Sequence, residues 1–192
     1  MDLTIGQPVN PVADPPHQND MSEYRRLYQP AGSYFFTLVT HRRIKFLSLP
    51  DSISRLQCAF DKVMEKYPFI MEAFVILPDH LHCLWRMPAG DSNYSLRWRL
   101  IKSYFSAGFN HPVNERGEKG IWQRRFWEHL IRDDKDWKTL MDYIHYNPVK
   151  HGYVKSPGDW LHSSFRQATQ DGFYVPDWGT EEPASITGMN LE

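Results

Sequence analysis

The amino-acid sequence predicts an α+β fold of the ferredoxin-like type, in which helices pack on a mostly antiparallel sheet. The expected elements alternate in the order strand, helix, strand, strand, helix, strand, helix. The chain has 192 residues, enough for one domain, and its 41% hydrophobic and 15% aromatic residues can form a real core. We therefore expect one ordered body.

The first strand and the first helix follow from local patterns. Residues 33–40 are rich in aromatic and β-branched side chains, which is typical of a strand. Apolar residues then recur at helical spacing from Ile53 to Tyr67. Asp51 or Ser52 can cap this helix, and the proline after Tyr67 ends it.

Five further elements complete the predicted order. Strands are expected at 74–77 and 80–87, with a Pro-Asp pair between them. Residues 91–93 start a helix with four apolar side chains on its buried stripe: Leu96, Leu100, Ile101 and Phe105. After a polar loop, a fourth strand is expected at 121–132. A last helix at 133–147 has acidic residues in its first turn, where the helix dipole favours them.

Composition divides the chain into three segments. Residues 1–20 contain four prolines and little apolar content, which is typical of a flexible arm. We expect the domain at 21–152 and an irregular C-terminal extension at 153–192. Three aromatic residues are expected to anchor this extension to the domain: Trp160, Phe165 and Trp178. The last dozen residues are expected to be loose.

The charges are unevenly distributed, although the net formal charge is only −1. Residues 21–150 carry 20 Lys and Arg against 14 Asp and Glu, whereas both ends are acidic. A basic body suits a polyanion such as nucleic acid, although scattered solubilising charges explain the same balance.

The sequence also bears on location. No run approaches the roughly 18 apolar residues of a membrane span. The first residues do not resemble a secretory signal, and two cysteines make no disulfide framework. We expect a cytoplasmic protein with no membrane partner.

Two histidines in the third predicted strand are candidate metal ligands. Residues two apart in a strand point to the same face, so His80 and His82 project together. Two imidazoles can bind Zn, Mn, Fe or Cu, and with added oxygen donors also Mg. Two partly exposed strand histidines that bind nothing explain the same pattern, and no third histidine follows at this spacing.

The last predicted helix carries a candidate nucleophile. At about 100° per residue, Tyr143 lies on the flank of the apolar stripe and Asn147 stacks on the same flank, whereas Tyr146 points toward solvent. Asn147 precedes a proline, which disfavours helical geometry, so the stacking requires the last turn to include Asn147. An ordinary amphipathic helix, with Tyr143 as a packing residue, explains the same spacing.

Four blocks of the sequence resemble one known family. They are MSEYRR at 21–26, LPDHLH at 77–82, IWQRRFWEH at 121–129 and DYIHYNPVKHG at 142–152. In this order they resemble the REP-associated tyrosine transposases, relatives of the IS200-like transposases in the HUH endonuclease superfamily. The resemblance covers roughly residues 21–178.

This resemblance implies an HUH domain and a mechanism. His80 and His82 correspond to the ligands of a divalent metal, Mg²⁺ or Mn²⁺, and Asn147 to the residue that completes the site. Tyr143 corresponds to the nucleophile. Members cut single-stranded DNA beside hairpins of repetitive extragenic palindromes (REP elements) in bacteria, through a 5′-phosphotyrosine intermediate. A monomer or a homodimer is expected.

Basic side chains that could neutralise DNA phosphates occur in several groups. The resemblance places Tyr24, Arg25 and Arg26 near the DNA-reading surface. Other candidates lie after the first strand, on the second and last helices, and in the fourth strand: Arg42, Arg43, Lys45, Arg97, Arg99, Lys102, Arg124, Arg125 and Lys150. Trp122 and Trp127 could stack on bases or lie in the core. A solvated charged surface explains each basic group equally well.

Two other functions stay open. The chain could be a catalytically silent protein that only binds single-stranded nucleic acid, although the intact histidines, tyrosine and asparagine argue against that. A metal-dependent hydrolase of small molecules would need no tyrosine and would leave no covalent adduct.

Overall fold

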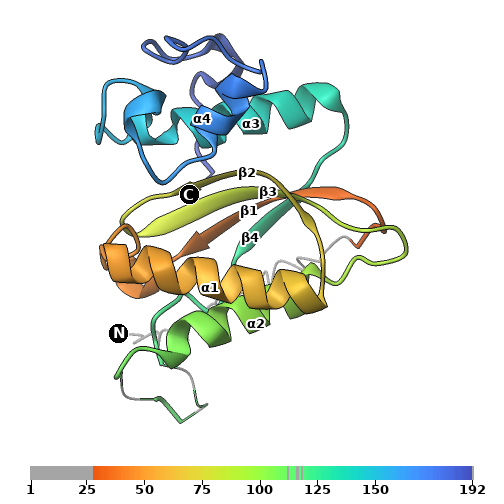
Figure 1. Ribbon diagram of the computed structural model, residues 1–192, viewed down its shortest axis with the longest axis vertical. Coiled ribbons are helices and arrows are strands. Elements are labelled where there is room, and N and C mark those ends of the chain that lie inside the picture. The colour runs from red at the N-terminus through yellow and green to blue at the C-terminus, as the bar shows by residue number, and fades with distance from the viewer. Residues whose placement is uncertain (1–27, 112, 116, 118, 192) are drawn as a thin grey trace, which may run out of the picture.

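A four-stranded sheet lies between two helical layers in the computed structural model, which describes residues 28–191 except 112, 116 and 118 (Figure 1). The strands are β1 (Ser33–Val39), β2 (Ile70–Ile76), β3 (His80–Arg86) and β4 (Trp127–Leu130). They lie in the order β2-β3-β1-β4, and every neighbouring pair is antiparallel.

The helices cover both faces of this sheet. One face is covered by α1 (Pro50–Lys66) and α2 (Tyr94–Ala107). The other is covered by α3 (Asp134–Lys150), α4 (Phe165–Gln170) and the C-terminal segment (Figure 1). The predicted α+β, ferredoxin-like fold class is confirmed.

Element boundaries differ from the predicted ones where tertiary contacts extend or shorten a local pattern. β2 begins at Ile70, four residues before its predicted start, because the antiparallel pairing with β3 extends to that end. The predicted strand at 121–132 is wrong in length. Only Trp127–Leu130 forms a strand, and Trp122 makes a single bridge to Thr40.

Two helices also differ in detail. The buried stripe of α2 consists of Tyr94, Arg97, Trp98, Ile101 and Phe105, so the predicted Leu96 and Leu100 are only half-buried. α3 continues through its internal proline to Lys150, so its last turns include Asn147. The stacking of Asn147 with Tyr143 on one flank therefore has the helical backbone that it requires.

Side chains of β3 alternate between two different environments. Leu81, Cys83 and Trp85 pack beneath α1 and α2 in an aromatic core. Leu84 packs beneath α3, and His80 and His82 share its side of the strand. The histidines are therefore on the α3 face.

The C-terminal extension has more structure than predicted. Its residues 162–164 pair with the edge of β2, where Ile76 N donates to His162 O at 2.8 Å. Farther along, Ser185 Oγ donates to the buried Asp142 at 2.8 Å, and Ile186 is buried. These contacts hold the final residues against α3, where the sequence predicts a loose end.

Two expectations from the sequence meet the limits of the described chain. The predicted arm at 1–20 and the candidates Tyr24, Arg25 and Arg26 lie outside the described residues. Among the described helices, none is both long and apolar enough to cross a membrane.

Candidate active site

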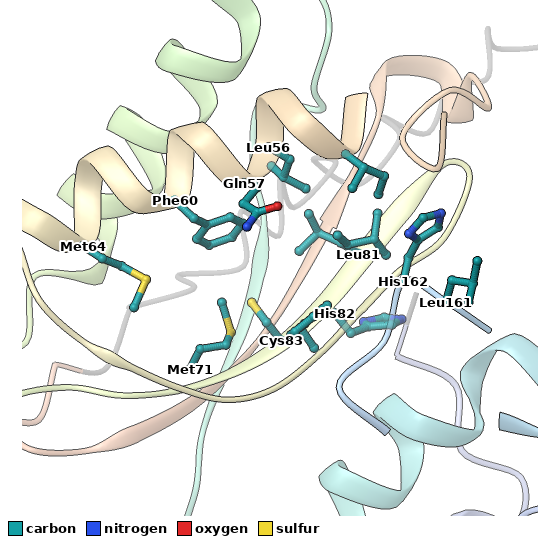
Figure 2. A pocket seen from close by; sticks show the side chains of 13 residues that line it. Leu56, Gln57, Phe60, Met64, Met71, Leu81, His82, Cys83, Leu161 and His162 are labelled. Carbon is teal, nitrogen blue, oxygen red and sulfur yellow. The ribbon is translucent and has the colours of Figure 1, made fainter. Parts of the chain in front are cut away.

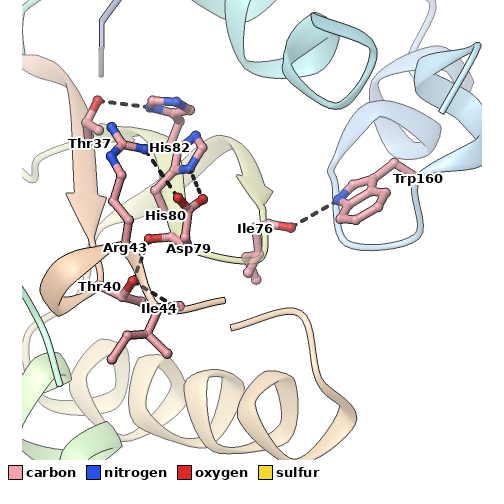
Figure 3. Close-up of polar contacts among 9 residues, drawn as sticks. All are labelled: Thr37, Thr40, Arg43, Ile44, Ile76, Asp79, His80, His82 and Trp160. Atoms are coloured by element: carbon pink, nitrogen blue, oxygen red, sulfur yellow. Dashed lines mark hydrogen bonds and ion pairs between the residues drawn. The ribbon is translucent and has the colours of Figure 1, made fainter. Parts of the chain in front are cut away.

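Two buried histidines form the floor of the site. His80 and His82 are 0% exposed, and His82 stands opposite Thr37 of β1 in the sheet. Asp79 Oδ1 contacts His80 Nδ1 at 2.7 Å, and Thr37 Oγ1 contacts His82 Nδ1 at 2.9 Å (Figure 3). Because these partners engage Nδ1 and set the ring orientation, Nε2 is the nitrogen through which each ring can ligate a cation.

Asp79 orients His80 and is itself held in place. Burial raises the pKa of the Asp79 carboxyl, but hydrogen bonds from His80 and Arg43 outweigh burial and hold that pKa below its usual range. Arg43 Nη1 lies 3.3 Å from Asp79 Oδ2 (Figure 3). Thr40 Oγ1 donates to the Asp79 carbonyl at 3.0 Å. The carboxylate is therefore a fixed, charged support for the imidazole.

Asn147 is a buried residue whose side-chain amide has no hydrogen-bond partner among the described residues. It is 0% exposed, and neither atom of its side-chain amide makes a hydrogen bond within the described part of the chain. Each unsatisfied buried polar group costs about 1–3 kcal/mol, so such a residue needs a reason. A role as oxygen donor to a divalent cation would be such a reason, since Asn147 lies one turn after Tyr143, whose ring contacts His82.

The number and type of side-chain ligands limit which cation could bind here. No group of three His, Cys, Asp or Glu that could hold a metal occurs among the described residues. Two imidazoles and one amide oxygen make an incomplete shell, which leaves positions for water and phosphate oxygens. The residues present therefore fit a divalent cation that also binds substrate.

Tyr143 lies against the histidines. It is 1% exposed, and its ring centroid is 5.3 Å from that of His82. Its hydroxyl accepts hydrogen bonds from Lys150 Nζ at 3.2 Å and from Leu191 N at 3.1 Å. The structure thus brings together the histidines and the tyrosine that the sequence singled out.

Tyr146 has a different environment from the predicted one. The prediction that it points to solvent is wrong, since its side chain is only 9% exposed. Burial raises the pKa of its hydroxyl, and the nearby Glu182 raises that pKa further. Tyr146 is therefore a packing residue under the C-terminal extension.

The last described residues close over the site. Leu191 donates its backbone N–H to Tyr143, and its carbonyl accepts from Thr37 Oγ1 at 3.0 Å. Lys150 Nζ donates to the Met189 carbonyl at 3.0 Å. The tail therefore bridges the phenol and the residue that supports His82, and a substrate must displace it to reach both.

Most of the predicted DNA-contacting residues lie on the surface. Arg42 and Arg43 adopt left-handed backbone angles, with φ of 54° and 52°, at the end of β1. Lys45 Nζ lies 5.9 Å from the centre of the Tyr153 ring. A hollow of about 660 Å³ beside α2 is lined by several polar and basic residues, among them Arg99, Lys102, Lys119 and Arg124. Arg125 is exposed.

Two residues that were predicted to contact DNA have side-chain partners within the protein. Arg97 is 1% exposed and donates to Asp91, Pro68 O and Tyr67 O, so it holds the start of α2 against the end of α1. Lys150 turns to the hydroxyl of Tyr143. Arg97 is therefore buried away from the surface, and Lys150 contacts the hydroxyl of the candidate nucleophile.

Sequence reasoning missed three residues at this site. Asp79 was visible as the neighbour of His80, but its role depends on the side-chain contact. Thr37 becomes a partner of His82 only through the register of β1 and β3. The ring of His151 lies 5.1 Å from that of His80, which no periodic pattern could reveal.

An apolar cavity of about 330 Å³ lies between α1 and strands β2 and β3, and His82 is one of its lining residues (Figure 2). Its walls are mostly aliphatic, aromatic and methionine side chains. Gln57, His82 and His162 are its only polar lining residues, and it carries no Asp, Glu, Lys or Arg. It is therefore unsuited to a phosphate substrate.

Comparisons with known proteins show the family of this chain. The family model for IS200-like transposases matches residues 29–147. A REP-associated tyrosine transposase of Escherichia coli K12 is 45% identical over 159 residues, which cover 82% of this chain and 91% of its own length. The chain belongs to the REP-associated tyrosine transposases.

Two further matches support the assignment of this transposase. A Haemophilus influenzae Rd relative in the same group is 45% identical over 175 residues, which cover 88% of this chain and 99% of its own. A solved structure of a REP-associated tyrosine transposase bound to a REP hairpin has a TM-score of 0.74 and 42% identity. That match covers 86% of this chain and 96% of the other. The resemblance found in the sequence is confirmed, and the protein is an enzyme of the tyrosine transposase class.

Proposed function

We propose that this transposase cuts single-stranded DNA beside a REP hairpin and carries the cut end on Tyr143 as a 5′-phosphotyrosine. The observation that carries this proposal is the packing of the Tyr143 ring against His82, with Lys150 at the phenol oxygen. A relative at 42% identity has been solved with a REP hairpin bound, which supports the choice of substrate.

His80, His82 and Asn147 would hold a divalent cation, Mg²⁺ or Mn²⁺. When bound, such a cation draws charge from a nonbridging phosphate oxygen and orients the scissile phosphate. The unsatisfied amide of Asn147 and the fixed imidazoles support this assignment, because all three are already buried before any ligand arrives.

The proposed reaction at Tyr143 is a transesterification of the scissile phosphodiester. Its Oη forms a bond to phosphorus while the bond from phosphorus to the 3′ oxygen breaks. The phenol loses a proton and the departing 3′ oxygen gains one, so a free 3′-OH remains. The Lys150 ammonium stabilises the negative charge on Oη during attack.

The covalent linkage also allows rejoining. A phosphotyrosine conserves the energy of the phosphodiester, so the 3′-OH of a second strand can displace Tyr143 without a nucleotide cofactor. The same residues then act in the reverse direction. Cutting and strand transfer are therefore one activity.

Basic side chains guide the strand to this centre. Arg43 lies beside Asp79, close to His80. The hollow beside α2 presents Arg99, Lys102 and Arg124, and it reaches His41, the residue before Arg42. We propose that these residues, with Arg125 and Lys45, neutralise phosphates, and that Tyr24, Arg25 and Arg26 contribute to reading the DNA.

The test uses a labelled hairpin oligonucleotide with a single-stranded flank, incubated with the protein and Mn²⁺. Wild-type protein should form an adduct that survives denaturing electrophoresis. Tyr143→Phe should bind the hairpin and form none, whereas the matched control Tyr146→Phe should still form it. His80→Ala should abolish metal-dependent cutting.

Each alternative gives a distinct result. An adduct in Tyr143→Phe would refute the nucleophile. Tight hairpin binding by wild-type protein without any cutting would favour a silent binding protein. Cutting without an adduct would favour a hydrolase.

A further inference from the structure

We propose that Trp127 is a stacking site for an unpaired base in the DNA flank close to the scissile phosphate. The inference rests on the proposed function, because it concerns the strand that Tyr143 cuts. It names a binding residue on a strand that contributes nothing to the reacting centre itself.

Trp127 points to the same face of the sheet as His82. In the sheet, Trp127 stands opposite Thr37, and Thr37 in turn stands opposite His82. Side chains of directly paired residues lie on the same face. Trp127 therefore shares the face of the metal ligands, while its neighbour Glu128 points to the α2 side, where Tyr94 donates to it.

The part of this face around Trp127 is open to solvent. α3 packs mainly on β2 and β3, so the half made by β1 and β4 has less helical cover. Trp127 is 39% exposed, whereas Trp85 and Trp98 on the other face are 0% exposed. An exposed indole beside an active site is available to a ligand in a way that a core indole is not.

Two neighbouring rings hold the indole of Trp127 in one orientation. The edge of Phe35 lies against it, with centroids 5.7 Å apart and planes at 71°. The ring of His129 lies nearly parallel to it, at 5.9 Å and 11°. His129 is fixed in turn by Asp136, at 2.7 Å. Because the indole is already ordered, a base that stacks on it costs little additional side-chain entropy.

Trp127 lies within a short distance of His82, and a basic side chain lies nearby in the chain. Two strand spacings separate β3 from β4, so the backbones at His82 and Trp127 lie roughly 10 Å apart. That span corresponds to a few nucleotides from the phosphate bound at the histidines. Arg125 is exposed just before β4, where it can neutralise a phosphate of such a strand. An aromatic side chain beside a cation is a common arrangement for holding unpaired nucleotides.

The experiment places 2-aminopurine, a base whose fluorescence falls on stacking, at successive positions on each side of the cleavage site in a hairpin oligonucleotide. Binding is measured on the Tyr143→Phe protein, so that no cutting intervenes. One or two positions should be quenched on binding. Adding Trp127→Ala should abolish that quenching, and adding Trp127→Phe should largely keep it.

The affinity for the hairpin provides a measurement independent of fluorescence quenching. Trp127→Ala should weaken binding about 5- to 150-fold, the range measured for single stacked bases. An abasic nucleotide at the quenched position should weaken binding to the same extent, and the two changes together should cost no more than either alone. Tyr104→Ala removes another exposed aromatic residue, on α2, and should change neither signal.

The outcomes separate this inference from the proposed function. Quenching that persists in Trp127→Ala, or additive losses for the indole and the base, would overturn the stacking site even if wild-type protein forms its adduct. Loss of an oligomer in Trp127→Ala without loss of quenching would overturn it in favour of contact between copies. Quenching lost only with Trp127 would support it, whether or not an adduct forms.

Discussion

On one face of the sheet, Trp85 stacks on Phe69 and Trp98 with ring centroids 4.0 and 4.2 Å apart, in a core without a metal ligand. On the other face, three residues earlier in the same strand, His82 is equally buried and contacts Thr37 and Tyr143. Trp85 and His82 are both fully buried. Their surroundings differ in what they can bind, because an indole offers no cation ligand, whereas the imidazoles and the amide oxygen of Asn147 can bind a cation.

The two faces of the sheet contribute differently to stability and to activity. Stacked rings beneath α1 and α2 gain free energy from burial and from aromatic contacts. Buried polar groups beneath α3 are neutral or costly unless a ligand satisfies them. Apolar cores lie on both sides of β3, but the proposed reacting groups lie on the α3 side, so substitutions in the aromatic core should change stability without changing the chemistry.

The largest expected effect comes from Asn147→Leu. Metal-dependent cutting should fall to background, because the oxygen ligand is lost. The midpoint of thermal unfolding should stay the same or rise, since two unsatisfied buried atoms disappear. Adduct formation and a thermal melt measured on the same sample check both halves. Undiminished cutting would remove Asn147 from the site.

The opposite pattern is expected for Phe69→Ala on the aromatic face. Truncating this buried ring should lower the free energy of unfolding by about 3–5 kcal/mol. Urea denaturation measures that loss. Below the unfolding transition, the variant should cut the hairpin at nearly the wild-type rate, because the ring is far from the reacting groups in the sheet. A rate loss with retained folding would show that the two faces are coupled.

Acidic pH should lower the free energy of unfolding through the buried His145 of α3. Burial lowers the pKa of His145 to about 3, so between its ordinary pKa of 6.5 and that value the unfolded chain binds the extra proton. Stability is therefore full above pH 6.5 and falls as the pH drops. Linkage sets the loss at up to about 2 kcal/mol between pH 6.5 and 5. Unfolding of His145→Gln should depend less on pH over this window, and an equal slope would exclude His145 as the cause.

The smallest effect concerns the tail over Tyr143. Deleting residues 189–192 removes the hydrogen bonds that Leu191 makes to Tyr143 and Thr37. Adduct formation should accelerate about 5- to 30-fold, if one or two bonds of about 1 kcal/mol must break before DNA enters. A time course with saturating hairpin measures this. Leu191→Ala is the control, because it keeps the backbone contacts and should retain the slow rate.

The sequence alone was sufficient for the order of the elements, the fold class and the family. It also placed His80 and His82 on one face and Tyr143 on the flank of its helix, because these properties depend on periods of two and of 3.6 residues, which are local. Helix and strand ends were less predictable, as the short β4 and the early start of β2 show.

Only the tertiary structure decided which groups meet. Thr37 supports His82 through strand register, Arg97 is buried by backbone carbonyls at the end of α1, and the tail reaches Tyr143 from 48 residues away. Such contacts join segments distant in the chain, and their geometry is set by how the layers pack. Sequence periodicity predicts the direction in which a side chain points from its own helix or strand. The packing of the helices and strands determines which residues that side chain contacts.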